Sequence, residues 1–318
     1  MADTVLRVED LSVYYYTLRG IVRAVEGAWL EARRGELVAI VGESGSGKST
    51  LGYSLLRLVP PPGRIVKGRI LVDGVDLTEL QGDELRRARG ELVSIVFQDP
   101  FTTLDPVRRI GDQLLEVLLE HGVPEEEARG RVPQLLESVG LPREAARAYP
   151  HQLSGGQRQR VSIAAAIALE PRVLVADEPT TALDVIVQKQ IMDLLDELRR
   201  RHGMAVVLVT HDIALAAERA SSIAIMYAGK IVEQGPAEEV LREPLHPYTR
   251  ALLDSVPDID NPRWPRPIPG QPPDLRRPPP GCRFAPRCPV VMEKCRSKEP
   301  PVVSPRPGRK AACWLHAP

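Results

Sequence analysis

A glycine-rich loop, set between an apolar strand and a helix, narrows the possible folds of this chain more than any other part of its sequence. Residues 36–41 read ELVAIV, a run typical of a buried strand. They lead into GESGSGKST at residues 42–50, which matches the pattern G-x-x-x-x-G-K-[ST] in full. Such glycines let backbone N–H groups surround phosphate oxygens, and the start of the next helix adds positive potential. We therefore predict an α/β fold with a phosphate-binding loop.

The residue types in this loop also predict its chemistry. Lys48 is placed to reach the β- and γ-phosphates of a nucleotide, and Ser49 is placed to ligate Mg²⁺. The alternative is a glycine-rich turn with a surface lysine and no ligand. The residues that we assign to nucleotide binding here are Gly42, Ser44, Gly45, Gly47, Lys48, Ser49 and Thr50.

Two carboxylates follow a second apolar strand. Residues 173–176 read VLVA, and Asp177 and Glu178 come directly after them. Charges at the end of a buried strand are costly unless they face a cation or a charged ligand. Ligands of open α/β sheets bind at the carboxyl ends of parallel strands. We assign Asp177 to Mg²⁺ and Glu178 to the base that orients and deprotonates water; a pair of acids that caps the next helix is the alternative.

The run LSGGQ, residues 153–157, predicts a second anion site at the start of a helix. Ser154, Gly155, Gly156 and Gln157 would present backbone and side-chain donors there. An ordinary helix cap is the alternative. Because one nucleotide does not need two phosphate-binding sites on one chain, we expect the second site to serve a nucleotide held by a neighbouring subunit.

Taken together, GESGSGKST, LSGGQ, VLVADEP, TTALD and VTHD resemble the nucleotide-binding subunit of an ATP-binding cassette (ABC) transporter. The resemblance covers about residues 4–255. It implies ATP hydrolysis on an α/β P-loop core with an N-terminal antiparallel β part and a helical insertion at about 105–170.

The same resemblance implies roles for residues outside the phosphate loop. Gln98 would contact Mg²⁺ and the attacking water, and His211 the γ-phosphate. Asp184 would lie at a dimer interface, and Ser154, Gly156 and Gln157 would contact the γ-phosphate held by the opposite subunit. An aromatic residue of an early strand stacks on adenine in this family. We assign Tyr15, with Tyr14 and Tyr16 as adjacent alternatives.

Longer runs resemble one group of importers within this family, the group for oligopeptides, dipeptides and nickel. These runs are FQDPFTTLDP, YPHQLSGGQRQRV, MYAGKIVEQGP and HPYTRALLDSVP. The resemblance implies a first-type ATPase subunit that pairs with a second, different ATPase subunit. It also implies two transmembrane permease subunits and an extracytoplasmic solute-binding protein, with this chain at the cytoplasmic face of the membrane. Peptides are the expected solute, with oligosaccharides and nickel as alternatives.

Two rival functions make different predictions. A non-transport cassette ATPase acting on nucleic acid would show a strongly basic face, long coiled coils or a second cassette. This chain has 42 Lys and Arg against 42 Asp and Glu, so we expect no nucleic-acid partner. A regulatory subunit without turnover is disfavoured because Lys48, Asp177, Glu178 and His211 are all present. The first ten residues contain three acids and no apolar run, so we expect no signal peptide.

Composition divides the chain near residue 255. Residues 256–318 contain 17 prolines, and 12 Lys and Arg against 5 Asp and Glu. We therefore predict an ATPase domain at 1–255 and a proline-rich extension at 256–318. A segment so rich in proline cannot form a hydrophobic core of its own, so we expect metal–thiolate bonds to order it.

All four cysteines lie in this extension, at Cys282, Cys288, Cys295 and Cys313. Disulfides are disfavoured in a cytoplasmic protein. Structural zinc sites usually show pairs of type C-x2–4-C, which are missing here. The run GCRFAPRCPVVMEKCR also resembles the C-terminal extension of peptide-importer ATPases, whose members carry an iron–sulfur cluster. A [4Fe–4S] cluster is therefore our prediction, and Zn²⁺ or free thiols are the alternatives.

Overall fold

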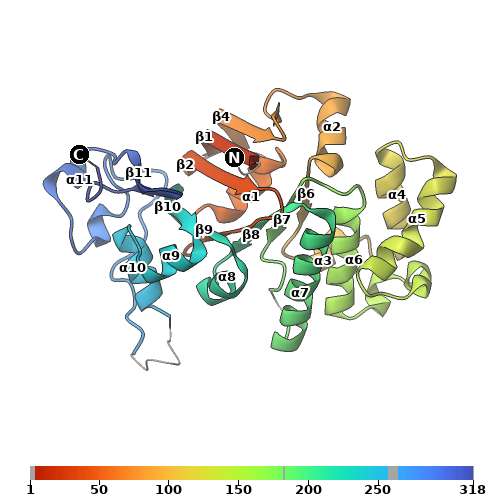
Figure 1. Ribbon diagram of the computed structural model, residues 1–318. Helices are drawn as coiled ribbons and strands as arrows, with labels where there is room; N and C mark the ends of the chain where they lie inside the picture. The colour runs from red at the N-terminus through yellow and green to blue at the C-terminus, as the bar shows by residue number, and fades with distance from the viewer. Residues whose placement is uncertain (1–3, 182, 257–263, 318) are drawn as a thin grey trace. The chain divides into compact units, whose positions relative to one another are not determined.

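The computed structural model describes residues 4–181, 183–256 and 264–317. Ala182, in the TTALD run, and residues 257–263, at the start of the extension, lie outside these ranges. The chain forms two compact units, whose elements are drawn in Figure 1. Unit 1 comprises Met1–Val5, Arg33–Gly35 and Val72–Val206, and unit 2 comprises Leu6–Ala32, Glu36–Leu71 and Val207–Pro318.

Unit 2 contains the expected N-terminal β part. Strands β1 (Thr4–Thr17) and β2 (Gly20–Arg33) are joined by two residues, which makes them a hairpin. The sheet has the order β2-β1-β4, where β4 is Gly63–Val72. Along β1, the buried apolar side chains are Val5, Leu6, Val8, Leu11 and Val13, and the exposed Arg7 and Asp10 lie between them.

The second sheet of unit 2 holds the strand that precedes the phosphate loop. All five side chains of β3 (Leu37–Val41) are buried, and β3 pairs in parallel with β9 (Ser222–Tyr227). Strand β9 forms a hairpin with β10 (Lys230–Pro236) through Ala228 and Gly229, which both have positive φ. Apolar side chains on both faces explain why these central strands are buried.

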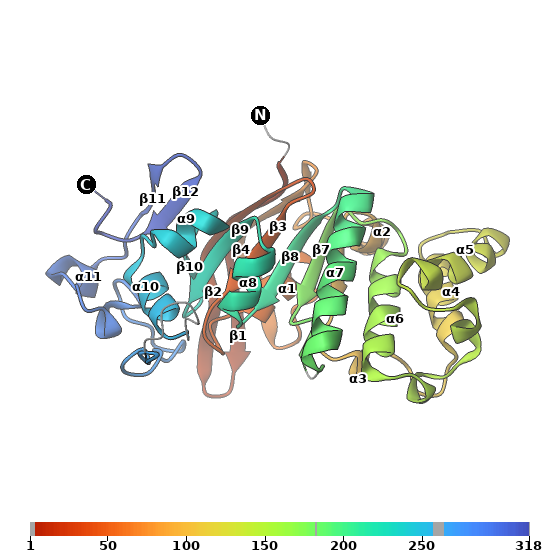
Figure 2. The ribbon, with the colours of Figure 1, turned by 60° about the horizontal axis from the view of Figure 1, so that its bottom comes forward.

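The proline-rich extension joins this sheet. Strand β12 (Arg309–Ala312) pairs antiparallel with β10, and β11 (Val302–Arg306) pairs with β12. Figure 2 shows both strands beyond β10, in the order β11-β12-β10-β9-β3. The extension therefore packs on the core of unit 2 through backbone pairing, which its composition did not predict. We expected metal–thiolate bonds to order the extension, and we did not predict this strand pairing.

Short helices complete unit 2. They are α1 (Lys48–Leu55), α8 (Ile213–Arg219), α9 (Ala237–Arg242), α10 (Pro247–Asp254), η3 (Ala285–Arg287) and α11 (Glu293–Ser297). Asp212 caps α8 and His246 caps α10, each by accepting a backbone N–H.

Unit 1 carries the helical region between two parallel strands, β6 (Val93–Val96) and β7 (Val173–Asp177). Before them lie β5 (Val75–Asp76) and α2 (Gly82–Glu91). The helical region consists of α3 (Pro100–Thr103), α4 (Ile110–Glu120), α5 (Glu125–Ser138), η1 (Arg143–Arg147), η2 (Pro150–Gln152) and α6 (Gly155–Ile167). Helix α7 (Val185–His202) follows β7, and β8 (Ala205–Thr210) leads into unit 2.

Prolines mark the starts of several helices in the helical region. Pro124 and Pro142 directly precede α5 and η1, and Pro150 is the first residue of η2. Proline suits these positions because the first turn of a helix has no internal partner for its N–H groups. The buried side chains of α4 and α5, among them Leu114 and Leu136, form the core of this region.

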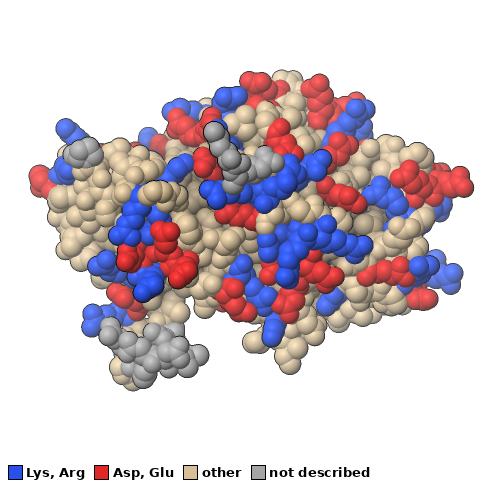
Figure 3. All heavy atoms as spheres, viewed as in Figure 1, with Lys and Arg blue, Asp and Glu red and all other residues tan. Residues whose placement is uncertain are grey.

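Charges of both signs are mixed on the surface. Figure 3 shows Lys and Arg next to Asp and Glu over the face that it draws. This agrees with the equal numbers of basic and acidic residues in the chain.

Candidate functional site

The phosphate loop in unit 2 is shaped by two glycines that approach backbone atoms closely. A Cβ at Gly42 would lie 2.0 Å from the carbonyl oxygen of Met226, and a Cβ at Gly47 would lie 2.2 Å from that of Ala24. Gly47 also has φ +102°, a conformation that favours glycine. The loop therefore lies close against β2 and the end of β9.

Helix α1 begins within this loop. Its first residue, Lys48, is buried, and Nζ donates to the carbonyl oxygens of Gly42 (2.8 Å) and Glu43 (3.0 Å). The hydroxyl of Ser46 is buried and has no hydrogen-bond partner among the described residues. A loop of this shape at a helix N-terminus presents backbone N–H groups to an anion. Ser44, Gly45, Ser49 and Thr50 belong to the same loop and first helical turn.

Of the three adjacent tyrosines, Tyr15 lies against the helix that follows the loop. Its hydroxyl is 3.3 Å from Oγ1 of Thr50. Tyr14 instead donates a hydrogen bond to Glu26 (2.7 Å). Burial, and to a smaller extent the Glu26 carboxylate, raises the pKa of Tyr14 to about 12. Tyr16 is 46% exposed. Position therefore favours Tyr15 over its neighbours as the adenine contact, which remains a prediction.

In unit 1, the structure brings Gln98 and Glu178 together. Nε2 of Gln98 donates to Glu178 (3.1 Å), and so does Oγ1 of Thr181 (3.0 Å). The parallel register that pairs Val96 with Ala176 explains this contact, because Gln98 lies two residues after Val96 and Glu178 lies two residues after Ala176. Asp177 is fully buried at the end of β7.

The LSGGQ run also lies in unit 1, where it starts α6. Oγ of Ser154 accepts from the backbone N–H of Gln157 (3.3 Å), and Oε1 of Gln157 accepts from the N–H of Ser154 (2.9 Å). This reciprocal cap is the ordinary structural role that the sequence allows. Gly155 and Gly156 form the first turn, and a Cβ at Gly156 would lie 2.7 Å from Cγ1 of Val187.

Two further predicted residues occupy helix starts. Asp184 caps α7 by accepting from the N–H of Val187 (3.0 Å). His211 is exposed and directly follows β8, next to Asp212, which caps α8. Asp184 belongs to unit 1 and His211 to unit 2. The predicted residues are thus grouped within each unit.

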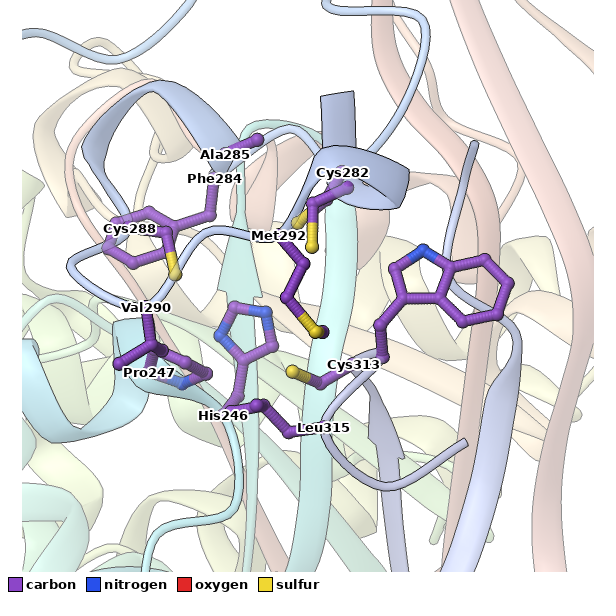
Figure 4. Close-up of a pocket in the computed structure, with 12 residues that line it drawn as sticks. His246, Pro247, Cys282, Phe284, Ala285, Cys288, Val290, Met292, Cys313 and Leu315 are labelled. Atoms are coloured by element: carbon purple, nitrogen blue, oxygen red, sulfur yellow. The ribbon is translucent and has the colours of Figure 1, made fainter. Parts of the chain in front are cut away.

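The four cysteines of the extension line one pocket in unit 2. All four are free, and the pocket contains about 310 Å³ of empty space, part of which is open to solvent. Figure 4 shows Cys282, Cys288 and Cys313 around this space, together with His246 and Met292. Burial raises the pKa of Cys282 to about 11. Among the described residues, no three His, Cys, Asp or Glu side chains form a group that could hold one metal ion.

Sequence analysis missed the arginines that connect the extension to the phosphate loop and to β10. Arg287 forms two hydrogen bonds to the carboxylate of Glu43, and Arg309 pairs with Glu233 inside the sheet. Their partners lie tens to hundreds of residues away in the chain. A single sequence does not distinguish an arginine that becomes buried from one that stays exposed, so no sequence pattern pointed to these two pairs.

Two family models match the chain. One, described as ABC transporter, matches residues 25–181, and the other, described as oligopeptide/dipeptide transporter C-terminal region, matches residues 232–295. The dipeptide transport ATP-binding protein DppD of Bacillus subtilis (strain 168) is 45% identical over 98% of this chain and 95% of its own length. The chain belongs to the ATP-binding subunits of ABC transporters.

One further relative and two solved structures are also similar to this chain. The oligopeptide transport ATP-binding protein OppD of Escherichia coli (strain K12) is 45% identical over 98% of this chain and 94% of its own. The ATP-binding cassette MJ0796, solved as a dimer bound to ADP and Pi, is 31% identical with a TM-score of 0.64, over 73% of this chain and 98% of its own. The structure of cbiO1 from Clostridium perfringens is 32% identical with a TM-score of 0.65, over 76% of this chain and 92% of its own.

This ABC subunit is an ATPase, and its α/β fold with an antiparallel β part and a helical region is the predicted one. No helix within the described ranges is both long enough and apolar enough to cross a bilayer.

Proposed function

We propose that this ABC ATPase powers the import of peptides. The observation that carries the proposal is similarity to dipeptide and oligopeptide transport proteins along the whole chain, including the C-terminal region characteristic of that group. Its partners would be two transmembrane permease subunits and an extracytoplasmic solute-binding protein. The subunit would bind peripherally at the cytoplasmic face of the membrane. Oligosaccharides and nickel are the alternative solutes.

The substrate can be tested in a reconstituted transporter. The chain is co-expressed with a second ATPase subunit, two permease subunits and a solute-binding protein from its source organism, and the complex is placed in lipid nanodiscs. We expect di- to pentapeptides with the binding protein to stimulate ATP hydrolysis, and a complex with Lys48→Ala to stay inactive. Stimulation by an oligosaccharide or by Ni²⁺, without stimulation by peptides, would replace the proposed substrate.

For the chemistry, we propose the roles that the motifs predict. Backbone N–H groups of residues 42–50 and Lys48 bind the phosphates, and Tyr15 stacks on adenine. Ser49, Gln98 and Asp177 supply oxygen ligands of the kind that Mg²⁺ prefers. Mg²⁺ neutralises charge on the β- and γ-phosphates when bound.

Glu178 and Gln98 are the residues that we assign to the attacking water. Glu178 accepts the proton of the attacking water, and its hydrogen bond to Gln98 orients the carboxylate. His211 contacts the γ-phosphate. Together these groups position water in line with the γ-phosphate, which is what phosphoryl transfer requires of the protein.

We also propose that Ser154, Gly155, Gly156, Gln157 and Asp184 act on a nucleotide bound by a second ATPase subunit, in a heterodimer. The exposed Val185 and Ile186, at the start of α7 beside Asp184, support an interface there. Ser154→Arg should then disable the nucleotide site of the partner.

This arrangement predicts an asymmetric result. If Ser154→Arg is combined with a partner whose own phosphate-loop lysine is mutated, both lesions fall in one site and the other site survives. If Ser154→Arg and Lys48→Ala are combined in this chain, both sites are lost. Equal ATPase activity in the two complexes would contradict the shared-site proposal.

For the extension, we propose a [4Fe–4S] cluster held by Cys282, Cys288, Cys295 and Cys313. Four free thiols around one pocket are the donor set such a cluster takes. The sequence lacks the close C-x2–4-C pairs of structural zinc sites, which favours a cluster over Zn²⁺. The cluster would supply metal–thiolate bonds that strengthen the packing of the extension.

Metal analysis tests this proposal. Anaerobically purified protein should absorb near about 400 nm and contain about four iron and four sulfide per chain. Cys288→Ser should lose the colour, whereas Lys48→Ala should keep it and lose ATP binding. One zinc per chain, or neither metal, would overturn the cluster.

A further inference from the structure

The extension reaches the phosphate loop through one buried side chain. Arg287, between Cys282 and Cys288, has a side chain that is 3% exposed. Its Nη1 donates to Oε2 of Glu43 (2.8 Å) and its Nη2 donates to Oε1 (3.0 Å). Such paired hydrogen bonds between guanidinium and carboxylate restrict both distance and orientation. Glu43 is the second residue of the phosphate loop, 244 positions away in the chain.

The other N–H groups of the guanidinium also donate hydrogen bonds. Nε donates to the carbonyl oxygen of Pro269 (2.8 Å), Nη2 to that of Ile268 (3.3 Å) and Nη1 to the hydroxyl of Tyr227 (3.3 Å). Arg287 is therefore held in place by the extension and by β9. A rigidly held guanidinium can set the position of the more exposed carboxylate, whose side chain is 26% exposed.

Further contacts hold the backbone of the same loop. The backbone N–H of Glu43 donates to the hydroxyl of Tyr248 (3.0 Å), and the carbonyl of Glu43 accepts from Lys48 (3.0 Å). The N–H of Gly229 donates to the carbonyl of Ser46 (2.7 Å). Moving Glu43 would therefore also move Lys48, the residue assigned to the β- and γ-phosphates.

An aromatic cluster joins these contacts to the cysteine pocket. Phe284 lines that pocket and is buried against Tyr227 and Tyr248, with ring centroids 5.2 and 5.4 Å away. Tyr227 and Tyr248 are the two tyrosines that contact Arg287 and Glu43. The extension thus touches the loop by an ion pair and by packed rings, all within unit 2.

We propose that Arg287 is a positioning residue for nucleotide binding: it neutralises and orients Glu43, and so makes the extension part of the ATP site. The proposal rests on ATP binding at this loop. A carboxylate in a phosphate-binding loop repels a triphosphate unless a cation compensates it. Arg287 supplies that cation from outside the ATPase motifs. By linkage, ATP binding must in turn stabilise the packed extension.

Three variants of the full-length chain separate this role from a simple structural tether. ATP affinity is measured by fluorescence titration with a labelled ATP analogue in the absence of Mg²⁺. Arg287→Gln leaves Glu43 uncompensated and should weaken binding about tenfold. Glu43→Gln removes the repelling charge and should bind at least as tightly as the unmodified chain. The double variant should recover most of the loss.

A tether alone predicts a different pattern, in which either single change weakens binding equally and the double variant recovers nothing. That pattern would overturn the proposal. If Arg287→Gln does not fold, Glu43→Gln decides by itself, because a tenfold loss in that variant contradicts charge compensation. Arg276→Gln is the matched control, since it removes an exposed arginine of the extension that pairs with Asp274 and should leave affinity unchanged.

Hydrogen exchange tests the reciprocal effect. ATP should slow amide exchange in residues 281–297 of the unmodified chain. The double variant should bind ATP and yet show a smaller slowing, because the ion pair is gone while the packed rings of Phe284, Tyr227 and Tyr248 remain. Unchanged exchange in the unmodified chain at saturating ATP would overturn the proposal, whereas absence of ATP binding would instead refute the ATP site itself.

Discussion

Glu178 combines an uncommon backbone conformation with a defined side-chain environment. Its φ is +43°, in the left-handed region that few non-glycine residues adopt. Such conformations cost free energy and persist where the surrounding structure imposes them, often at functional sites. Here the conformation follows directly after the buried Asp177 and allows the Glu178 carboxylate to meet Gln98 and Thr181.

This environment predicts the effect of Glu178→Gln. The amide keeps the size of the side chain but cannot accept the proton of water, so turnover should fall by about 10² or more. ATP binding should remain, since Lys48 and the loop are unchanged. Steady-state hydrolysis and nucleotide titration measure the two quantities. Hydrolysis near that of the unmodified chain would remove Glu178 as the base.

At the scale of elements, the first turn of α6 packs closely on α7. The two glycines of the LSGGQ run differ in this respect. A Cβ at Gly156 would lie 2.7 Å from Val187, whereas a Cβ at Gly155 would lie 3.4 Å from Leu183, an ordinary contact distance. Gly156 therefore has a packing role in addition to any role toward a nucleotide.

Gly156→Ala should consequently destabilise unit 1 by about 1–3 kcal/mol, the cost of overpacking. Gly155→Ala is the matched control and should change stability little. Adding Val187→Ala should relieve the clash and restore much of the lost stability. Chemical denaturation measures these differences. If Gly156→Ala unfolds at the same denaturant concentration as the unmodified chain, the packing argument is wrong.

At the scale of the whole molecule, the extension is attached by a buried ion pair. Arg309 on β12 and Glu233 on β10 are both fully buried. Glu233 also accepts from the N–H groups of Leu245 and His246, and Arg309 donates to the carbonyl of Glu243 (2.9 Å). Removing one partner of such a pair leaves a buried charge without compensation.

Arg309→Met should therefore destabilise the chain by about 3–5 kcal/mol. It should also make the extension sensitive to protease, because β12 loses its side-chain anchor beside β10. Arg306→Met, on the neighbouring strand, removes an exposed pair with Glu243 and should have little effect. Denaturation and limited proteolysis compare the two variants, and equal behaviour would contradict the anchor.

Much of the fold and the candidate site could be predicted because the signals are local. The apolar run before Gly42, the glycine-rich loop that follows it and the LSGGQ run each depend on a few consecutive residues. The contact between Gln98 and Glu178 needed the pairing of β6 with β7, which lie about 80 positions apart. Sequence motifs named both residues, but only strand register explains why they meet.

The sequence by itself determined the ATPase motifs, the two helix starts that are predicted to bind anions and the composition of the extension, because backbone conformation and residue chemistry act locally there. Only the tertiary structure decided where the extension goes. Strand pairing with β10, the Arg309–Glu233 pair and the Arg287–Glu43 pair all join residues far apart in the chain. Their free energy comes from burial and complementary charge, which exist only once the chain has folded.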